Sequence, residues 1–200
     1  MKRNIVTLTL LVAIQLVSAQ EKLSREEALT YAQLVSADAK QLAGTPITTD
    51  VDAQQPVALR DGEYGGMVLP QKNLKAETLA KAGESIIPIG QLWLLKLTPM
   101  VDSSGIPGDK LRLVTVKHEG EEYTVPQCAL GVRRTSAGTL ELLVYGKGKE
   151  PVVTEPLKAV DTKSEAPLDV SAIKTDDGAS VTLKILGKYE AKLMVTGFEP

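Results

Sequence analysis

The stretch that decides the fold runs from Val170 to Val195 and reads VSAIKTDDGASVTLKILGKYEAKLMV. Apolar and polar residues alternate along it, and a period of two is typical of strands with one buried face. Asp177-Gly178 is the strongest hairpin signal within it. Taken as a two-residue loop, this dipeptide predicts three opposite pairs: Val170 with Ile185, Ala172 with Leu183, and Lys174 with Val181.

A second turn is expected around Gly187. A two-residue loop there would mix apolar and polar residues on one face, whereas a three-residue loop, Gly187-Lys188-Tyr189, keeps the faces apart. Because a one-residue slip turns every side chain to the other face, we favour the longer loop. The sequence thus predicts a three-stranded meander that needs a covering layer. Its predicted buried face consists of Val170, Ala172, Val181, Leu183, Ile185, Ala191, Leu193 and Val195.

The rest of the chain also favours antiparallel strands. The most hydrophobic segment of the mature chain, 86–98, predicts one central strand with Trp93, Leu95 and Leu97 on one face and Leu92 and Leu94 on the other. Turn signals every few residues fit a sandwich or a partly open barrel of roughly ten strands, α+β by strict counting and mainly antiparallel β. The other predicted strands are 57–60 and 64–69, 111–118 with 121–125, and 128–134 with 140–145.

One N-terminal helix is predicted within residues 20–44. Ser24 and Glu27 form a capping box, in which each side chain can bond the backbone N–H of the other residue. We expect the helix to reach Leu42 or Ala43 and to end at Gly44. Its apolar stripe is thin, so we interpret it as a helix packed on the edge of the domain; the alternative is a mobile arm that pairs with a partner helix.

Two polar segments predict the domain organisation. Residues 45–56 are rich in turn formers and read as a linker between the helix and a β-rich domain at 57–200. Residues 147–167 carry several Lys, Glu and Pro residues and mark a possible boundary inside that domain. Val152-Val153, flanked by prolines, could form an edge strand within this second segment.

The first 19 residues predict a cleavable export signal. Lys2 and Arg3 precede an apolar stretch from 5 to 17, and Val17-Ser18-Ala19 offers the small residues that signal peptidase needs, so cleavage is expected before Gln20. The stretch is shorter than the roughly 20 residues that span a bilayer. We therefore expect a soluble mature chain without stable membrane insertion, although an uncleaved anchor helix is the alternative.

Charge and cysteine content narrow the setting further. Removal of residues 1–19 takes away Lys2 and Arg3 and no acidic residue, so the formal charge falls from −2 to −4. Such a chain lacks the basic surface of a nucleic-acid binder. With Cys128 as the one cysteine, no intramolecular disulfide can form, and an apolar core must supply the stability. The absence of a glycosylation sequon favours a bacterial periplasmic or secreted protein.

Nucleophilic chemistry finds little support. His118 is the one histidine and is expected at the tip of the 111–125 hairpin. Cys128 would lie seven residues farther along the same strand pair, roughly 23 Å away, so we reject a Cys–His pair. A buried, inert Cys128 is expected, with an intermolecular disulfide as the alternative. We predict no catalytic residue, no cofactor and no metal site.

Four exposed residues are the candidates for ligand or partner contact. Asp61, Glu63 and Asp102 are loop carboxylates near the hydrophobic segment, and Tyr64 is the one aromatic residue expected at the surface beside them. These considerations favour a non-enzymatic exported protein that binds an envelope or secreted partner. Two alternatives stay open: a carboxylate-based hydrolase of an extracellular polymer, and a carrier of a small ligand in an apolar cavity.

Overall fold

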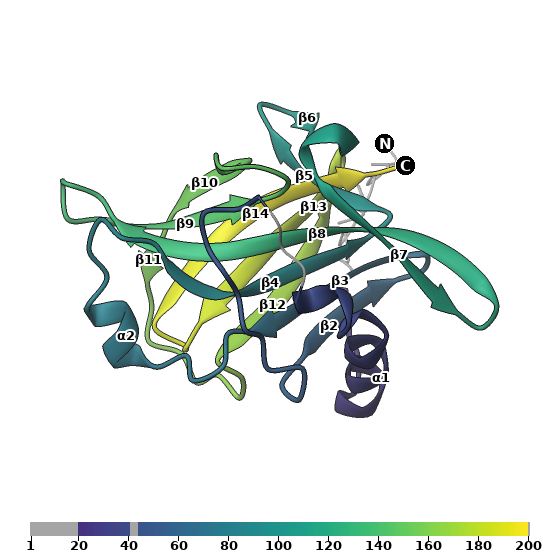
Figure 1. Ribbon diagram of the computed structural model, residues 1–200, viewed down its shortest axis with the longest axis horizontal. Helices are drawn as coiled ribbons and strands as arrows, with labels where there is room; N and C mark the ends of the chain where they lie inside the picture. The colour runs from purple at the N-terminus through teal and green to yellow at the C-terminus, as the bar shows by residue number, and fades with distance from the viewer. Residues whose placement is uncertain (1–19, 41–43, 200) are drawn as a thin grey trace, which may run out of the picture.

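Two antiparallel β-sheets pack face to face, and neither sheet closes into a barrel (Figure 1). The computed structural model describes residues 20–40 and 44–199; the predicted export signal, 1–19, lies outside the described residues. The predicted α+β, mainly antiparallel β fold is confirmed, and of the two architectures left open, a sandwich or a partly open barrel, the structure has the sandwich. Among the described residues, no helix is long and apolar enough to cross a bilayer.

The first sheet has eight strands and the second has six. The first contains, in spatial order, β1 (Glu21–Lys22), β2 (Val57–Asp61), β3 (Tyr64–Pro70), β4 (Ile87–Leu95), β8 (Glu121–Arg134), β9 (Leu140–Tyr145) and β10 (Val153–Pro156), with β7 (Arg112–His118) also paired to β8. The second contains β12 (Leu168–Thr175), β13 (Gly178–Ile185), β14 (Tyr189–Gly197), β5 (Leu97–Val101) and β6 (Ser104–Gly105), with β11 (Lys158–Ala159) also paired to β14.

The predicted meander is present as β12, β13 and β14, and its predicted buried face is correct. All eight residues of that face belong to the core cluster between the sheets. Both predicted registers are wrong by two residues, because Val170 lies opposite Leu183 and Val181 lies opposite Leu193. A two-residue slip leaves every side chain on its own face, so the hydrophobic pattern could not detect it.

The first turn shows why the register shifted. Its loop is Asp176-Asp177, and neither residue has a positive φ. Gly178 is instead the first residue of β13, with φ +149°, and a Cβ there would lie 2.0 Å from the Val195 carbonyl oxygen of β14. Glycine is therefore required for close approach of two backbones and not for the turn. The second loop has three residues, as predicted, but consists of 186–188.

The predicted single strand 86–98 is wrong, because the chain changes sheets within it. β4 ends at Leu95, Lys96 has φ +53°, and β5 begins at Leu97 in the second sheet. Leu92 and Leu94 face the core between the sheets and Trp93 faces the opposite side, as predicted. Leu97 was expected beside Trp93, but the break at Lys96 turns it into the core.

β8 joins two strands that were predicted separately. Residues 121–134 form one continuous strand through Pro126, which lies opposite Leu113 of β7. β7 and β9 pair with successive parts of β8, and β4 pairs with its other edge. Two predicted turns are confirmed by the pairing of His118 with Glu121 and of Arg134 with Leu140.

The N-terminal helix α1 (Arg25–Val35) covers the outer face of the first sheet. Its capping box is confirmed: the Glu27 N–H donates to Ser24 Oγ at 3.3 Å, and the Ser24 N–H donates to Glu27 Oε2 at 3.0 Å. The predicted end at Leu42 or Ala43 is wrong, since the α-helix stops at Val35 and a short 3₁₀ turn, η1 (Asp38–Lys40), follows. Ala28, Ala32 and Val35 are buried against the sheet, as expected for a packed helix.

The predicted linker, 45–56, is packed onto the same face of the sheet. Ile47 and Thr49 are buried, and Val51 forms an isolated β-bridge with Gln71. The segment carries few regular elements because its polar residues bond locally, as when the Gln54 N–H donates to Asp52 Oδ1 at 2.9 Å. It is thus a fixed strap and not a free connection.

Segment 147–167 carries the chain from the first sheet to the second. The expected edge strand is present as β10, which pairs with β9, and β11 then pairs with β14. A short helix, α2 (Ala76–Ala80), and a 3₁₀ turn, η2 (Gly108–Lys110), occupy other connections. The core cluster is therefore shared by residues from both sheets and from the segments that join them.

The close approach at Gly178 can be tested by substitution. We expect Gly178→Ala to lower the free energy of unfolding by about 3 kcal/mol, because it combines a strained φ with a backbone overlap. Gly138→Ala is the matched control: its φ is +85°, but a Cβ there meets nothing within 4 Å, so we expect about 1 kcal/mol. Urea unfolding measures both changes, and equal losses would contradict the explanation.

Candidate functional site

The predicted contact residues occupy two separate hairpins. Asp61, Glu63 and Tyr64 lie at the β2–β3 turn, where Tyr64 pairs with Asp61 and is 39 % exposed. Glu63 forms an ion pair with Lys96, and this hydrogen bond raises the pKa of Lys96. Asp102 lies at the β5–β6 turn of the second sheet, at the opposite end of β5 from Lys96. Partner contact at these residues stays a prediction.

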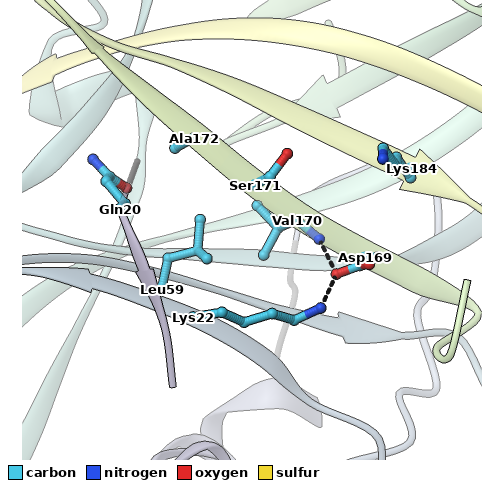
Figure 2. Close-up of a pocket in the computed structure, with 8 residues that line it drawn as sticks. All are labelled: Gln20, Lys22, Leu59, Asp169, Val170, Ser171, Ala172 and Lys184. Atoms are coloured by element: carbon cyan, nitrogen blue, oxygen red, sulfur yellow. Dashed lines mark hydrogen bonds and ion pairs between the residues drawn. The ribbon is translucent and has the colours of Figure 1, made fainter. Parts of the chain in front are cut away.

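A cleft that the sequence did not indicate lies beside the edge strand β12. It has a volume of about 150 Å³ and contains none of the four predicted contact residues. Figure 2 shows β12 crossing above the residues of β1 and β2 that form the opposite wall. The lining residues are Gln20, Lys22, Leu59, Asp169, Val170, Ser171, Ala172 and Lys184.

The cleft follows the free edge of β12. β12 is the first strand of its sheet, and it pairs only with β13 among the described strands. All eight of its residues pair in continuous register, so no bulge interrupts this edge. Four consecutive residues, 169–172, line the cleft. A strand edge of this kind presents backbone N–H and C=O groups that another chain can pair with.

An ion pair links the two walls of the cleft. Lys22 Nζ of β1 lies 2.8 Å from Asp169 Oδ1 of β12, and the Val170 N–H donates to the same oxygen at 2.8 Å (Figure 2). Lys22 is half exposed, so we expect the pair to contribute at most about 1 kcal/mol. The pair connects β1 and β12, which are the edge strands of the two sheets.

The chemistry available in the cleft is narrow. Asp169 is the one carboxylate among the lining residues, and neither histidine nor cysteine is present there. Lys184 is the second cation, and its register neighbours are Asp169 on β12 and Glu190 on β14. Within the parts of the chain that the structure describes, no three His, Cys, Asp or Glu residues group as metal ligands. The cleft is equipped for polar and backbone contacts.

A second group of residues missed by the sequence analysis is a buried amide network under the strap. Gln91 and Gln127, on adjacent strands β4 and β8, are both 0 % exposed. Gln91 Nε2 donates to the Ala39 carbonyl at 2.7 Å and to Thr49 Oγ1 at 2.6 Å. Gln91 Oε1 accepts from Trp93 Nε1 at 3.2 Å and from Gln127 Nε2 at 3.0 Å.

This network fastens the N-terminal segment to the first sheet. Both the amide nitrogen and the amide oxygen of Gln91 form hydrogen bonds, whereas Gln127 Oε1 has no hydrogen-bond partner among the described residues. Arg112 of β7 lies opposite Gln127 in the β7–β8 register. Its Nη1 donates to the Asp38 carbonyl at 3.3 Å, and burial lowers the pKa of Arg112. Polar residues inside otherwise apolar strands were the available sequence signal for this anchor.

The proposed separation of His118 and Cys128 agrees with the strand register. His118 pairs with Glu121 at the hairpin tip, and Cys128 lies seven residues farther along β8, where it pairs with Leu92. The His118 ring packs edge-on against Tyr31, with 5.6 Å between centroids. Cys128 is fully buried, as expected, and burial raises the pKa of its thiol to about 12. A fully buried thiol cannot form an intermolecular disulfide in the folded chain.

The amide network predicts unequal effects for two similar substitutions. We expect Gln91→Leu to lower the free energy of unfolding by about 3 kcal/mol, because it removes hydrogen bonds from four buried groups. Gln127→Leu should change stability by less than about 1 kcal/mol, since it removes one bond together with an unsatisfied acceptor. Urea unfolding measures stability, and hydrogen exchange should show faster exchange at 45–53 in Gln91→Leu alone. The reverse order of effects would refute the anchoring role.

Cys128 gives a further prediction about the folded state. Because the thiol is buried and its pKa is about 12, almost none of it is the reactive thiolate at pH 8. We expect no reaction of the native chain with Ellman's reagent on the time scale of minutes, and complete reaction after unfolding in urea. Rapid native reaction would show that the core around β4 and β8 opens readily.

Comparisons with known proteins were made on sequence and on structure. No family model matches the chain, and searches of curated proteins and of solved structures found no match either. The function proposed below therefore depends on the residues of the β12 edge and on their chemistry.

Proposed function

We propose that the chain is an exported, non-enzymatic binding protein that contacts a polypeptide partner through the free edge of β12. The observation that supports this most directly is the length and regularity of that edge, eight residues in continuous register beside an open cleft. An extended segment of another protein can add to such an edge as a further strand. The partner would be another envelope or secreted protein.

The composition of β12 supports strand addition. Natural edge strands are commonly blunted by charges, prolines, bulges or short length. The central residues of β12, Val170 to Ile173, carry no charge, and Ile173 is 51 % exposed. The charges lie toward the ends, at Asp169 and Lys174, and Asp169 is already bonded to Lys22. Apart from the Val170 N–H, which donates to Asp169, the middle of this edge thus presents backbone groups without an electrostatic barrier.

The two other functions considered have less support. A carboxylate-based hydrolase needs two carboxyl groups about 5 to 10 Å apart across one cleft, and this cleft supplies Asp169 alone. Pockets for small ligands usually enclose about 300 to 1,000 Å³, whereas this cleft encloses about 150 Å³. The space between the sheets is lined with buried apolar side chains that pack on one another.

Two substitutions on the same outer face of the second sheet test the proposal. Ile173 and Met194 belong to one cross-strand row, since each lies opposite Ser180. Ile173 lies on the edge strand, and Met194 lies on β14 inside the sheet, where its backbone is already paired. A lysine on an edge strand opposes pairing with a further strand. We expect Ile173→Lys to weaken partner binding at least about tenfold, equivalent to about 1.4 kcal/mol, and Met194→Lys to leave it unchanged.

Binding is measured with a phage-displayed library of random peptides, selected on the immobilised mature protein. Enriched peptides are then titrated against the three proteins, and a photoreactive benzoylphenylalanine at Ser171 maps the contact by cross-linking. Equal binding by wild type and Ile173→Lys, or cross-links confined to the β2–β3 and β5–β6 turns, would contradict the edge. Point variants are preferable to deletion of 20–44, because deletion would uncover the apolar face beneath α1.

A further inference from the structure

Gln20 occupies a defined place in the fold. It immediately precedes β1, whose two residues pair with Arg60 and Leu59 of β2. Its side chain is partly buried and lines the cleft together with Leu59 and Ala172 (Figure 2). The backbone at this position is therefore held against the sandwich and is not a remote tail.

Export would make Gln20 the first residue of the mature chain. This step depends on the proposed export and on the predicted cleavage after Ala19. A free N-terminal glutamine can cyclise: its α-amino nitrogen attacks the side-chain amide carbon and forms a lactam N–C bond. The amide C–N bond breaks, and the nitrogen leaves as ammonia with the proton that the amine gives up. The reaction needs no oxidant, reductant or other co-reactant.

The surroundings of Gln20 disfavour the open, charged form. Gln20 lies beside Leu59 and Ala172, whereas the ammonium groups of Lys22 and Lys184 lie toward the other end of the cleft (Figure 2). The single lining carboxylate, Asp169, is already bonded to Lys22 and to the Val170 N–H. Glu21, the next residue along the chain, lies opposite Arg60 in the β1–β2 register. A cation that lies against apolar walls, with no free carboxylate among the lining residues, is destabilised, whereas a neutral lactam avoids that cost.

We propose that the mature chain carries pyroglutamate at position 20, formed from Gln20, with the lactam ring seated in the cleft between β1 and β12. The modification removes the terminal positive charge and leaves one N–H and one carbonyl at the end of the cleft. It also blocks the N-terminus against aminopeptidases, which is an advantage outside the cell. The ring would lie in the same cleft as the β12 edge, next to the place where a partner strand would pair.

Mass spectrometry of the exported protein tests this inference. The full chain, including residues 1–19, is expressed in a secreting bacterial host, purified from the exported fraction and held at neutral pH until its mass is constant. We expect a chain that begins at position 20 and is lighter than the open form by one ammonia. Its N-terminus should resist Edman degradation until pyroglutamyl aminopeptidase removes the first residue. An open Gln20, a different first residue, or retention of residues 1–19 would overturn the proposal.

Two variants at position 20 serve as controls. Gln20→Ala cannot cyclise, and Gln20→Glu, which has the same side-chain length, cyclises far more slowly; both should keep an open amine and be readable by Edman degradation. Ammonia loss in Gln20→Ala would assign the mass change to another residue and would contradict the inference. The result does not depend on peptide binding at β12, so failure of one proposal leaves the other to be judged separately.

Discussion

The structure depends on covering the apolar face of the C-terminal meander. β12, β13 and β14 place one row of apolar side chains each toward the first sheet, and strands of this kind are not stable without a covering layer. The first sheet supplies that layer with Leu92 and Leu94, but its other face, which carries Trp93, is also apolar. That face must be covered in turn, and α1 with the strap at 45–56 covers it. The N-terminal segment is thus needed because the sheet that covers the C-terminal meander has a second apolar face.

The sequence predicted the layers better than the alignment of strands within them. Alternation fixes which side chains face the core, so all eight meander residues were assigned correctly. It does not distinguish registers that differ by two residues, because both bury the same set. Gly178 was read as a turn residue, although its role is a close backbone approach to Val195 of β14, the strand that pairs with the other edge of β13. Such tertiary demands are invisible in a local pattern.

The cleft could not be foreseen for a related reason. Residues 86–98 read as one strand, since nothing in the local pattern marks Lys96 as a crossing point. The crossing places β5 next to β14, and it is this strand order that leaves β12 at the edge. Asp61, Glu63, Tyr64 and Asp102 were chosen by residue type and expected exposure, whereas the cleft is defined by strand order. Gln91 and Gln127 are buried polar residues, and a local pattern does not distinguish a buried polar side chain in a strand from an exposed one.

The open edge of β12 also bears on how such a protein avoids self-association. An edge of eight residues with an uncharged centre is a template for pairing, and the chain has no disulfide to restrain opening of its sheets. Lys22 partly compensates by reaching from β1 to Asp169, which places a charged pair near one end of the β12 edge. In the proposed binding mode, a partner strand would enter next to this ion pair as an extended segment. The ion pair that limits indiscriminate pairing would, under the proposed function, also make the edge selective for its partner.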